Sequence, residues 1–367
     1  MEPLYPPVLT VGSESNAACL ADEEISFSVT GYEGFEVEIL RLRNSNRPVR
    51  QSRKYLDWRY GGGGNVSEAR IFWAIAASGE RIGMASLICR SYWVDDNLQR
   101  FAVLGDISLE VEARGKGHGK RLLAFVTNYV KTQMPNVKLA FVIPNEAAQK
   151  SLATVGWTTT GKFLSYAFFV DCTELLARRI PYGNLVKLLA RIIAKPLMLL
   201  PALHIHPEFT IDVVNEIEES LGDLWTGFPK QKMILRDMAF DSMRWRYANH
   251  PNIEFKVAKL LKATRLHGYV IFAIGPQEKT CHIYDLLVLD KKRLNCMLAM
   301  FLRYCAQSKE VSCVRLLLND SHPYRKGLWT LGFVPRGTQG EFQVYSGKGS
   351  GHREFSGWCL TMGDKDI

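Results

Sequence analysis

Residues 101–134 have the sequence FAVLGDISLEVEARGKGHGKRLLAFVTNYVKTQM, and this stretch decides the fold. Its first part alternates polar and apolar side chains, which predicts a strand with two different faces. Its last part has apolar residues at helical spacing and stops before Pro135, which predicts a helix. Between them lies the glycine-rich turn Arg114-Gly115-Lys116-Gly117-His118-Gly119-Lys120. A strand that enters such a turn and leaves directly as a helix is suited to binding phosphate.

The physical basis of this prediction is the backbone of the turn. Glycines let the chain turn tightly and approach a ligand, successive N–H groups point into the turn, and the helix N-terminus adds partial positive charge. Arg114, Lys116 and Lys120 add electrostatic attraction. The turn lacks the three-residue closing step of the dinucleotide fingerprint and the Gly-Lys-Ser/Thr of a Walker loop. We therefore predict a pyrophosphate site that uses neither motif.

The neighbouring segments predict a mixed α/β sheet. Residues 70–77 and 81–93 are β-rich and joined by the turn-like Ser78-Gly79-Glu80, as in a hairpin. Residues 137–143 form another predicted strand, and Asn145 opens a second helix that ends at Gly156. The predicted order is strand, strand, strand, helix, strand, helix, strand.

An internal repeat organises the whole chain. Trp58-Arg59-Tyr60 recurs as Trp245-Arg246-Tyr247, at an offset of 187 residues. Three further landmarks recur in the same order at offsets of 185, 179 and 176, namely Gly83 with Gly268, Asp106 with Asp285, and Gly156-Trp157 with Gly332-Phe333. We predict two copies of one fold, residues 1–171 and 211–367, joined by a helical linker at residues 172–210.

The linker carries a basic stripe formed by Lys187, Arg191 and Lys195. Two interpretations remain open: an amphipathic helix packed on the domains, or a helix lying on an anionic membrane surface. Pro196 and the interspersed charges exclude a membrane span, which needs about 20 apolar residues.

Composition sets broad limits on the class of protein. The 367 residues fit two domains, and the formal net charge of +9 suits an anionic ligand. The eight cysteines show no C-x-x-C pairing, and no basic and apolar leader opens the chain, so we expect a cytosolic protein. The basic residues are dispersed, which argues against nucleic-acid binding. The pair His204 and His206 has no further ligands nearby in sequence, so we expect no metal.

At the glycine turn the sequence resembles the Gcn5-related (GNAT) acetyltransferase superfamily. Its acyl-CoA motif, [R/Q]-x-x-G-x-[G/A], is matched by Arg114, Gly117 and Gly119. A second family landmark, an asparagine before a helix with a Gly-Phe/Trp end, is matched by Asn145 and Gly156-Trp157. The resemblance covers about residues 30–170, and the second copy only through the repeat. The tandem arrangement and the ending SGWCLTMGDKD also look like GNAT proteins encoded near bacterial polysaccharide genes.

The resemblance implies a donor, a set of contacts and a base. The donor would be acetyl-CoA or another acyl-CoA, with the main chain of Leu109, Glu110 and Val111 beside the pantetheine arm. The predicted cofactor-binding residues are these three together with Arg114, Gly115, Lys116, Gly117, His118, Gly119, Lys120 and Asn145. The predicted catalytic groups are Asp106, as base or acceptor-orienting group, and Glu110. Asp285 stands at the matching place in the second copy, so a structural role for Asp106 stays open.

Two departures from the family pattern affect the chemistry. Many members carry a proton-donating tyrosine seven residues after the asparagine, but this chain has Leu152 there. Either Ser151 or water then donates the proton, or the thiolate leaves unassisted. The second copy has VLDKKRLNCMLAMFL in place of the glycine turn, so we predict that it binds no acyl-CoA.

The function that follows is acyl transfer from acyl-CoA to a primary amine of a small molecule or amino sugar, by direct attack. The alternatives are a non-catalytic acyl-CoA-binding scaffold and an aminoacyl or long-chain acyl transferase that uses another carrier.

Overall fold

The computed structural model describes residues 25–47, 49–61, 69–171, 199–275, 277–346 and 357–365. The predicted basic helix with Lys187, Arg191 and Lys195 lies outside these residues. Within the described part, no helix is both long and apolar enough to cross a membrane. The chain forms two compact units. Unit 1 comprises residues 1–92, 99–160 and 341–354, and unit 2 comprises residues 93–98, 161–340 and 355–367.

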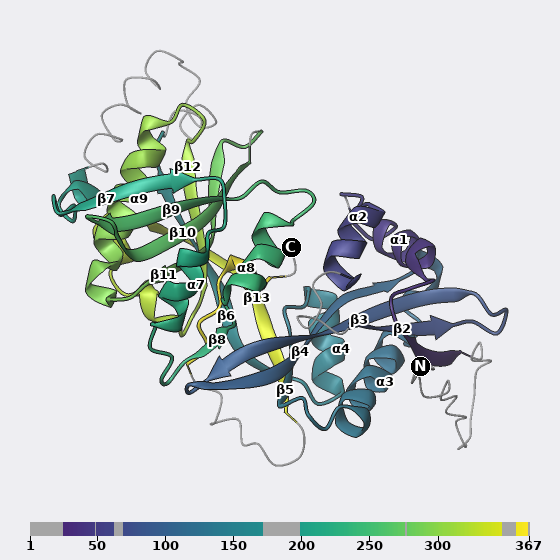
Figure 1. Cartoon of the computed structure of the whole chain (residues 1–367). Helices are drawn as coiled ribbons and strands as arrows, with labels where there is room; N and C mark the ends of the chain where they lie inside the picture. Colours follow the sequence, from purple (N-terminus) through teal and green to yellow (C-terminus); the bar gives the residue numbers. More distant parts are fainter. Residues whose placement is uncertain are drawn as a thin grey trace. The chain divides into compact units, whose positions relative to one another are not determined.

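Unit 1 is a mixed sheet with helices on both faces. Its strands follow the order β1-β2-β3-β4-β5-β13, with α1 and α2 on one face and α3 and α4 on the other (Figure 1). The first repeat of the sequence supplies β1 Ser26–Thr30, α1 Glu36–Asn44, α2 Arg53–Leu56, the π-helix Asp57–Gly61, β2 Ala69–Ile75, β3 Arg81–Val94, β4 Asn97–Leu109, a 3-10 turn Val111–Ala113, α3 His118–Gln133, β5 Leu139–Val142, α4 Glu146–Thr154 and β6 Thr158–Phe169.

The core of unit 1 lies between the sheet and α3, as the helical spacing predicts. Leu122, Val126 and Val130 on one face of α3 pack with Phe72 and Leu87 of the sheet. This burial of an apolar stripe, rather than helix propensity, stabilises a helix of this kind.

Unit 2 repeats the arrangement, with the strand order β6-β12-β11-β10-β9-β7. α9 covers one face of this sheet (Figure 1). The second repeat of the sequence supplies β7 Phe209–Val214, α7 Glu219–Thr226, β8 Ile234–Arg236, α8 Phe240–Met243, the π-helix Arg244–Ala248, β9 Lys256–Lys262, β10 Arg265–Gly275, β11 Thr280–Val288, a 3-10 turn Lys291–Arg293, α9 Leu294–Gln307, β12 Cys313–Asn319, the 3-10 turns Pro323–Arg325 and Leu328–Leu331, β13 Val334–Tyr345 and a 3-10 turn Met362–Asp364.

The landmarks of the sequence repeat occupy matching places. Both Trp-Arg-Tyr tripeptides lie in a π-helix. Both strand glycines stand where a side chain would collide, since a Cβ on Gly83 would lie 2.4 Å from Leu109 and one on Gly268 would lie 2.8 Å from the Leu287 carbonyl oxygen. The repeat therefore preserves sites of close backbone approach.

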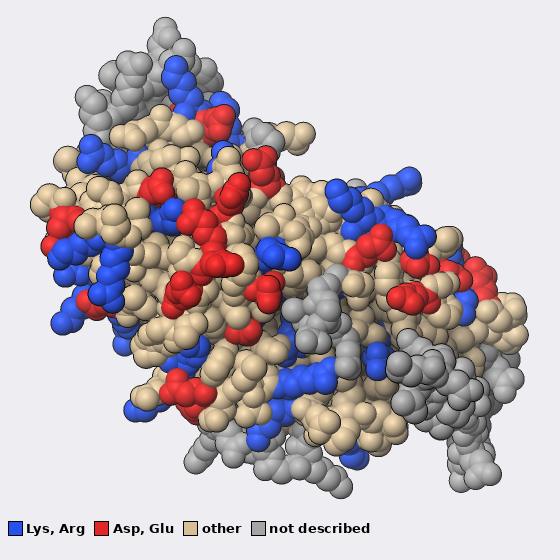
Figure 2. Space-filling model, in the orientation of Figure 1, with Lys and Arg blue, Asp and Glu red and all other residues tan. Residues whose placement is uncertain are grey.

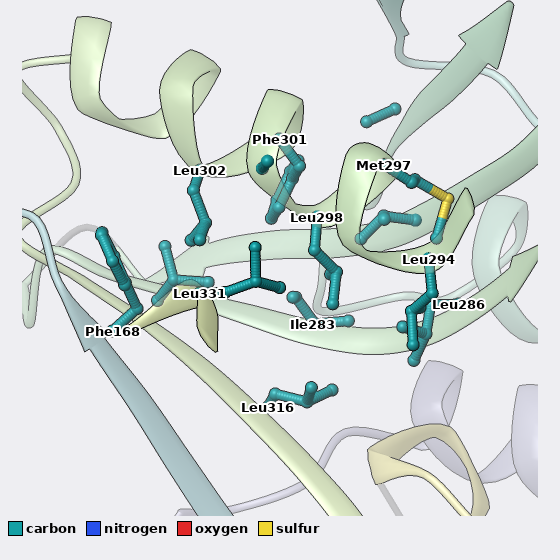
Figure 3. Close-up of a cluster of buried hydrophobic side chains, with 14 of the residues drawn as sticks. Phe168, Ile283, Leu286, Leu294, Met297, Leu298, Phe301, Leu302, Leu316 and Leu331 are labelled. Carbon is teal, nitrogen blue, oxygen red and sulfur yellow. The ribbon is translucent and has the colours of Figure 1, made fainter. Parts of the chain in front are cut away.

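Each unit contains a strand from the other repeat. In unit 1, Gln343–Tyr345 of β13 pair antiparallel with β5. In unit 2, residues 163–169 of β6 pair antiparallel with β12 along its full length. Phe168 of β6 points into the cluster of α9 side chains that forms the core of unit 2 (Figure 3). The predicted domain boundary at residue 171 puts β6 in the first domain and β13 in the second. The structure instead places residues 161–169 of β6 in unit 2 and residues 341–345 of β13 in unit 1. The sequence does not indicate this exchange, because strand pairing between distant segments has no local sequence signal.

This exchange predicts that residues 1–171 alone do not form a stable unit 1. That fragment lacks Glu341–Tyr345, so one edge of β5 has no partner and the ring contact of Tyr345 with Trp157, at 5.9 Å, is lost. We expect aggregation and no cooperative thermal transition by circular dichroism, because unpaired edges promote association. The control is the same fragment with residues 334–346 fused through a flexible linker, which should melt cooperatively. Equal melting of the two fragments would contradict the prediction.

Candidate functional site

The glycine-rich turn connects β4 to α3 with left-handed backbone at two positions. Gly115 has φ of 78° and Gly117 has φ of 80°, and this region strongly favours glycine. Gly117 is the N-cap residue of α3 and supplies no side-chain cap. Because the first four N–H groups of an α-helix have no intrahelical acceptor, the start of α3 is suited to receive an anion.

A groove of about 860 Å³ lies beside this turn. Its lining includes residues 107–109 of β4, beyond the point where β5 ends: the two strands pair in parallel over Phe101–Leu104 and Leu139–Val142, while β4 continues to Leu109. Seven of the predicted cofactor-binding residues line it, namely Leu109, Arg114, Gly115, Gly117, Gly119, Lys120 and Asn145.

Leu109 is held at the groove by two glycines. A Cβ on Gly83 would lie 2.4 Å from Leu109 Cδ2, and one on Gly119 would lie 3.1 Å from Leu109 Cδ1. The Leu109 carbonyl accepts a hydrogen bond from Arg114 Nε at 3.3 Å. Asn145 caps α4, because its side-chain oxygen accepts from the Ala148 N–H at 2.9 Å. The second family landmark thus shapes the groove wall.

The remaining predicted contact residues lie elsewhere. Val111 is 61% exposed and begins the 3-10 turn, and His118 is buried as the first residue of α3. Neither they nor Lys116 belongs to the described lining of the groove. The Glu110 N–H donates to the Ile82 carbonyl at 2.9 Å, so it is not available to a pantetheine arm. The Glu110 carboxylate forms an ion pair with Arg41.

Asp106 is the centre of a buried ion-pair cluster. It is 4% exposed and has φ of 50°, a left-handed conformation that aspartate tolerates better than most residues. Its carboxylate accepts hydrogen bonds from Arg43 and Arg47 at Oδ1 and from Arg59, Tyr60 and Ser86 at Oδ2. The donor–acceptor distances are 3.0 Å from Arg47, 2.8 Å from Arg59 and 3.1 Å from Ser86.

These contacts bear on the predicted role of Asp106 as a base. A carboxylate has about four lone-pair sites, and here it already accepts five hydrogen bonds. No site remains to receive a proton from a substrate amine. The geometry fits a residue that holds α1, the π-helix and β4 together.

A related cluster surrounds Asp285 in unit 2. This carboxylate pairs with Arg236 of β8 and accepts from Thr361 Oγ1 at 2.5 Å. Arg236 also donates to the Tyr247 hydroxyl at 3.0 Å. Tyr60 and Tyr247 occupy the same place in the two Trp-Arg-Tyr tripeptides, but Tyr60 bonds its aspartate directly, whereas Tyr247 is linked to Asp285 through Arg236. The joint recurrence of tripeptide and aspartate in the sequence indicates this spatial association.

Sequence reasoning missed one side of the groove. Asn46, Arg47, Val49 and Gln51, in the segment after α1, line it together with Ser108 and Ser151. No motif marks that segment, which comes to the groove only because α1 packs on the sheet. Leu152, at the expected tyrosine position, is fully buried in the core, whereas its neighbour Ser151 faces the groove.

The charge of the groove is positive. Its described lining includes Arg47, Arg114 and Lys120 but no Asp or Glu. Over the rest of the visible surface, acidic and basic residues are interspersed (Figure 2). The groove can therefore attract phosphate and accommodate a polar acceptor, but no carboxylate among the described lining residues can remove a proton. The described residues also contain no group of three or more His, Cys, Asp or Glu that could hold a metal.

Comparison with known proteins identifies the first repeat. Residues 37–157 match the model of the acetyltransferase (GNAT) family. No curated protein matches the chain. Among solved structures, a probable N-acyltransferase from Enterococcus faecalis has 13% identity and a TM-score of 0.60, with 88% of this chain and 72% of that chain covered.

Two further structures share the fold. A GCN5-related N-acetyltransferase from Anabaena variabilis has 12% identity and a TM-score of 0.61, with 87% and 72% covered. A tandem GNAT protein from the clavulanic acid biosynthesis pathway has 12% identity and a TM-score of 0.53, with 89% of this chain and 100% of that chain covered. Such similarity establishes a common tandem fold, in agreement with the prediction of two related domains.

The cluster geometry predicts that Asp106→Asn reduces the free energy of unfolding by ~3 kcal/mol or more, because it leaves buried arginines without their counter-ion. Urea unfolding measures this loss, and Asp285→Asn should act similarly in unit 2. The control is Glu112→Gln, an exposed acidic residue close to Asp106 in sequence. An Asp106→Asn protein of unchanged stability that lost only turnover would instead support a catalytic role.

Proposed function

We propose that unit 1, whose residues 37–157 match the acetyltransferase (GNAT) family model, transfers an acyl group, most simply acetyl, from acyl-CoA to a primary amine of a small molecule or amino sugar. The observation that carries this proposal is the groove lined by the glycine turn and by the end of β4. It combines an anion site with a cavity of about 860 Å³, as a donor with a pyrophosphate and a long arm requires.

The donor half rests on the turn and on the strand ends. The N–H groups at the start of α3, with Arg114 and Lys120 beside them, would hold the pyrophosphate. The pantetheine arm would lie along the opening between β4 and β5. Leu109, fixed between Gly83 and Gly119, forms the wall of that opening.

The chemistry must proceed without a nearby carboxylate. The amine nitrogen attacks the thioester carbonyl carbon, the carbon–sulfur bond breaks, and the coenzyme A thiolate takes up a proton. Asp106 and Glu110 are both engaged in ion pairs, so we assign them positioning roles. The amine would lose its proton to water, and the Ser151 hydroxyl, which lines the groove, would pass a proton from solvent to the thiolate.

The acceptor half is lined by neutral polar groups and one cation. Asn46 and Gln51 supply amides, Ser108 a hydroxyl and Arg47 a guanidinium. Amides and hydroxyls can donate and accept hydrogen bonds with sugar hydroxyls, whereas a polyamine would need carboxylates for its additional charges. This lining favours an amino sugar over a polycationic acceptor.

A second candidate is an acyl-CoA-binding protein without turnover. It is favoured by the absence of a carboxylate from the described groove lining and by Leu152 at the tyrosine position.

Gly117→Glu should abolish acetyl-CoA binding in calorimetry, because the side chain adds bulk and negative charge at the start of α3. Gly79→Glu is the matched control: Gly79 has φ of 86°, close to the 80° of Gly117, and neither has an atom within 4 Å of an added Cβ. Both variants therefore carry similar backbone strain, and only Gly117→Glu should lose binding. Loss of acetyl-CoA binding in both variants would mean that the glycine turn has no specific role in binding.

Acetyl transfer over a panel of amines separates an enzyme from a binding protein. We expect turnover with amino sugars exceeding that with spermidine-like polyamines. We also expect kcat/KM to rise with pH up to the pKa of the acceptor amine, because only the free base attacks. Acetyl-CoA binding without turnover on any amine would support the second candidate.

A further inference from the structure

Strands β11 and β12 of unit 2 stop pairing before either strand ends, at the place that corresponds to the end of the β4–β5 pairing in unit 1. They pair in parallel only over Thr280–Ile283 and Cys313–Leu316, although β11 runs on to Val288 and β12 to Asn319. Parted strands leave backbone N–H and C=O groups that need partners. In unit 1 the corresponding opening is the groove described above.

In unit 2 the opening is filled by residues Gly357–Asp364, here termed the C-terminal segment. Thr361 forms an antiparallel bridge with Leu318. Since β6 already pairs with the other edge of β12, this bridge lies on the edge that β11 has left. The Asn319 N–H donates to the Leu360 carbonyl at 3.1 Å, and Asn319 Oδ1 accepts from the Leu360 N–H at 2.8 Å.

The C-terminal segment is also held from its other sides. The Ile234 N–H donates to the Gly357 carbonyl at 2.9 Å, and the Ile234 carbonyl accepts from the Cys359 N–H at 3.0 Å. Thr361 Oγ1 donates to Asp285 of β11. Trp358 is 1% exposed and Leu360 is fully buried. A short segment bound along both main-chain edges, with buried side chains, is bound as a peptide is in strand addition.

One glycine sets how closely the C-terminal segment approaches the Asp285 cluster. A Cβ on Gly363 would lie 2.4 Å from both Asp285 Oδ2 and the Tyr247 hydroxyl oxygen. Its φ is not among the positive values, so steric contact alone excludes a side chain there.

The phosphate end of the matching site is closed as well. Asp290 precedes the 3-10 turn that leads into α9, and its Oδ1 accepts from the Lys292 N–H at 3.0 Å. At the N-cap of the long helix, unit 1 has Gly117 and unit 2 has Arg293. Unit 2 thus lacks the glycine backbone that would receive a phosphate, and Asp290 already uses the Lys292 amide.

We propose that the groove of unit 2 is a peptide-binding site whose ligand is the chain's own C-terminal segment. With this segment along the strands and no glycine turn before α9, unit 2 is closed to coenzyme A, and the chain binds one acyl-CoA. The stoichiometry rests on the function proposed for unit 1, whereas the contacts of the C-terminal segment do not.

The test uses the full chain with a specific protease site placed within residues 347–354, folded whole and then cut. The released segment should co-elute with the protein in gel filtration and be displaced by excess labelled peptide of residues 357–367. The same peptide with Gly363→Ala should compete about tenfold less well or worse, because the added methyl overlaps buried atoms. Separation of the cut segment in gel filtration, or equal competition by both peptides, would overturn the proposal.

Variants of the uncut chain provide a second readout. Gly363→Ala should lower the melting temperature, whereas Gly275→Ala should not, since a Cβ on Gly275 meets its nearest atom at 3.7 Å. Equal melting temperatures would count against the C-terminal segment as a bound ligand. Acetyl-CoA titration of the uncut chain should give one site, and two sites would overturn the closure of unit 2. Absence of any acetyl-CoA binding would reject the function of unit 1 while leaving retention of the segment intact.

Discussion

A buried carboxylate that must be satisfied governs unit 1. Asp106 gathers guanidinium groups from α1 and from the π-helix around itself, and each would carry a heavy desolvation cost if left alone. Because Arg47 reaches the same carboxylate and also lines the groove, the cluster fixes the wall against which an acceptor would bind. The position of the groove wall therefore follows from charge neutralisation deep in the domain.

Local features of both units could be predicted from the sequence. The glycine turn, the helix after it and the capping role of Asn145 follow from short-range rules, since spacing and backbone conformation determine them within a few residues. The repeat was visible because its landmarks keep their order. The partners of Asp106 could not be assigned in this way, because Arg43 and Arg47 reach it only after α1 has packed on the sheet. The exchange of β6 and β13 was equally hidden, since an antiparallel strand looks alike whichever neighbour it pairs with.

The two repeats show how one framework supports two uses. Both keep the tripeptide, the buried aspartate and the parted central strands. They differ at a few positions: glycine against arginine at the N-cap of the long helix, and an open groove against one that contains a segment of the chain itself. Conservation of the framework and loss of the anion site are therefore independent, because the first depends on buried ion pairs and the second on the local chemistry of a turn.

The strand exchange also sets the order in which the protein can be completed during its synthesis. The sheet of unit 1 includes Gln343–Tyr345 beside β5, so its last strand leaves the ribosome only after residue 345 has been made. Domains usually fold one after another as the nascent chain emerges. Here the N-terminal domain has to wait, with the edge of β5 exposed, until most of the second repeat has been translated. Translation of the second repeat is thus a period during which the first is open to chaperones and to misassociation.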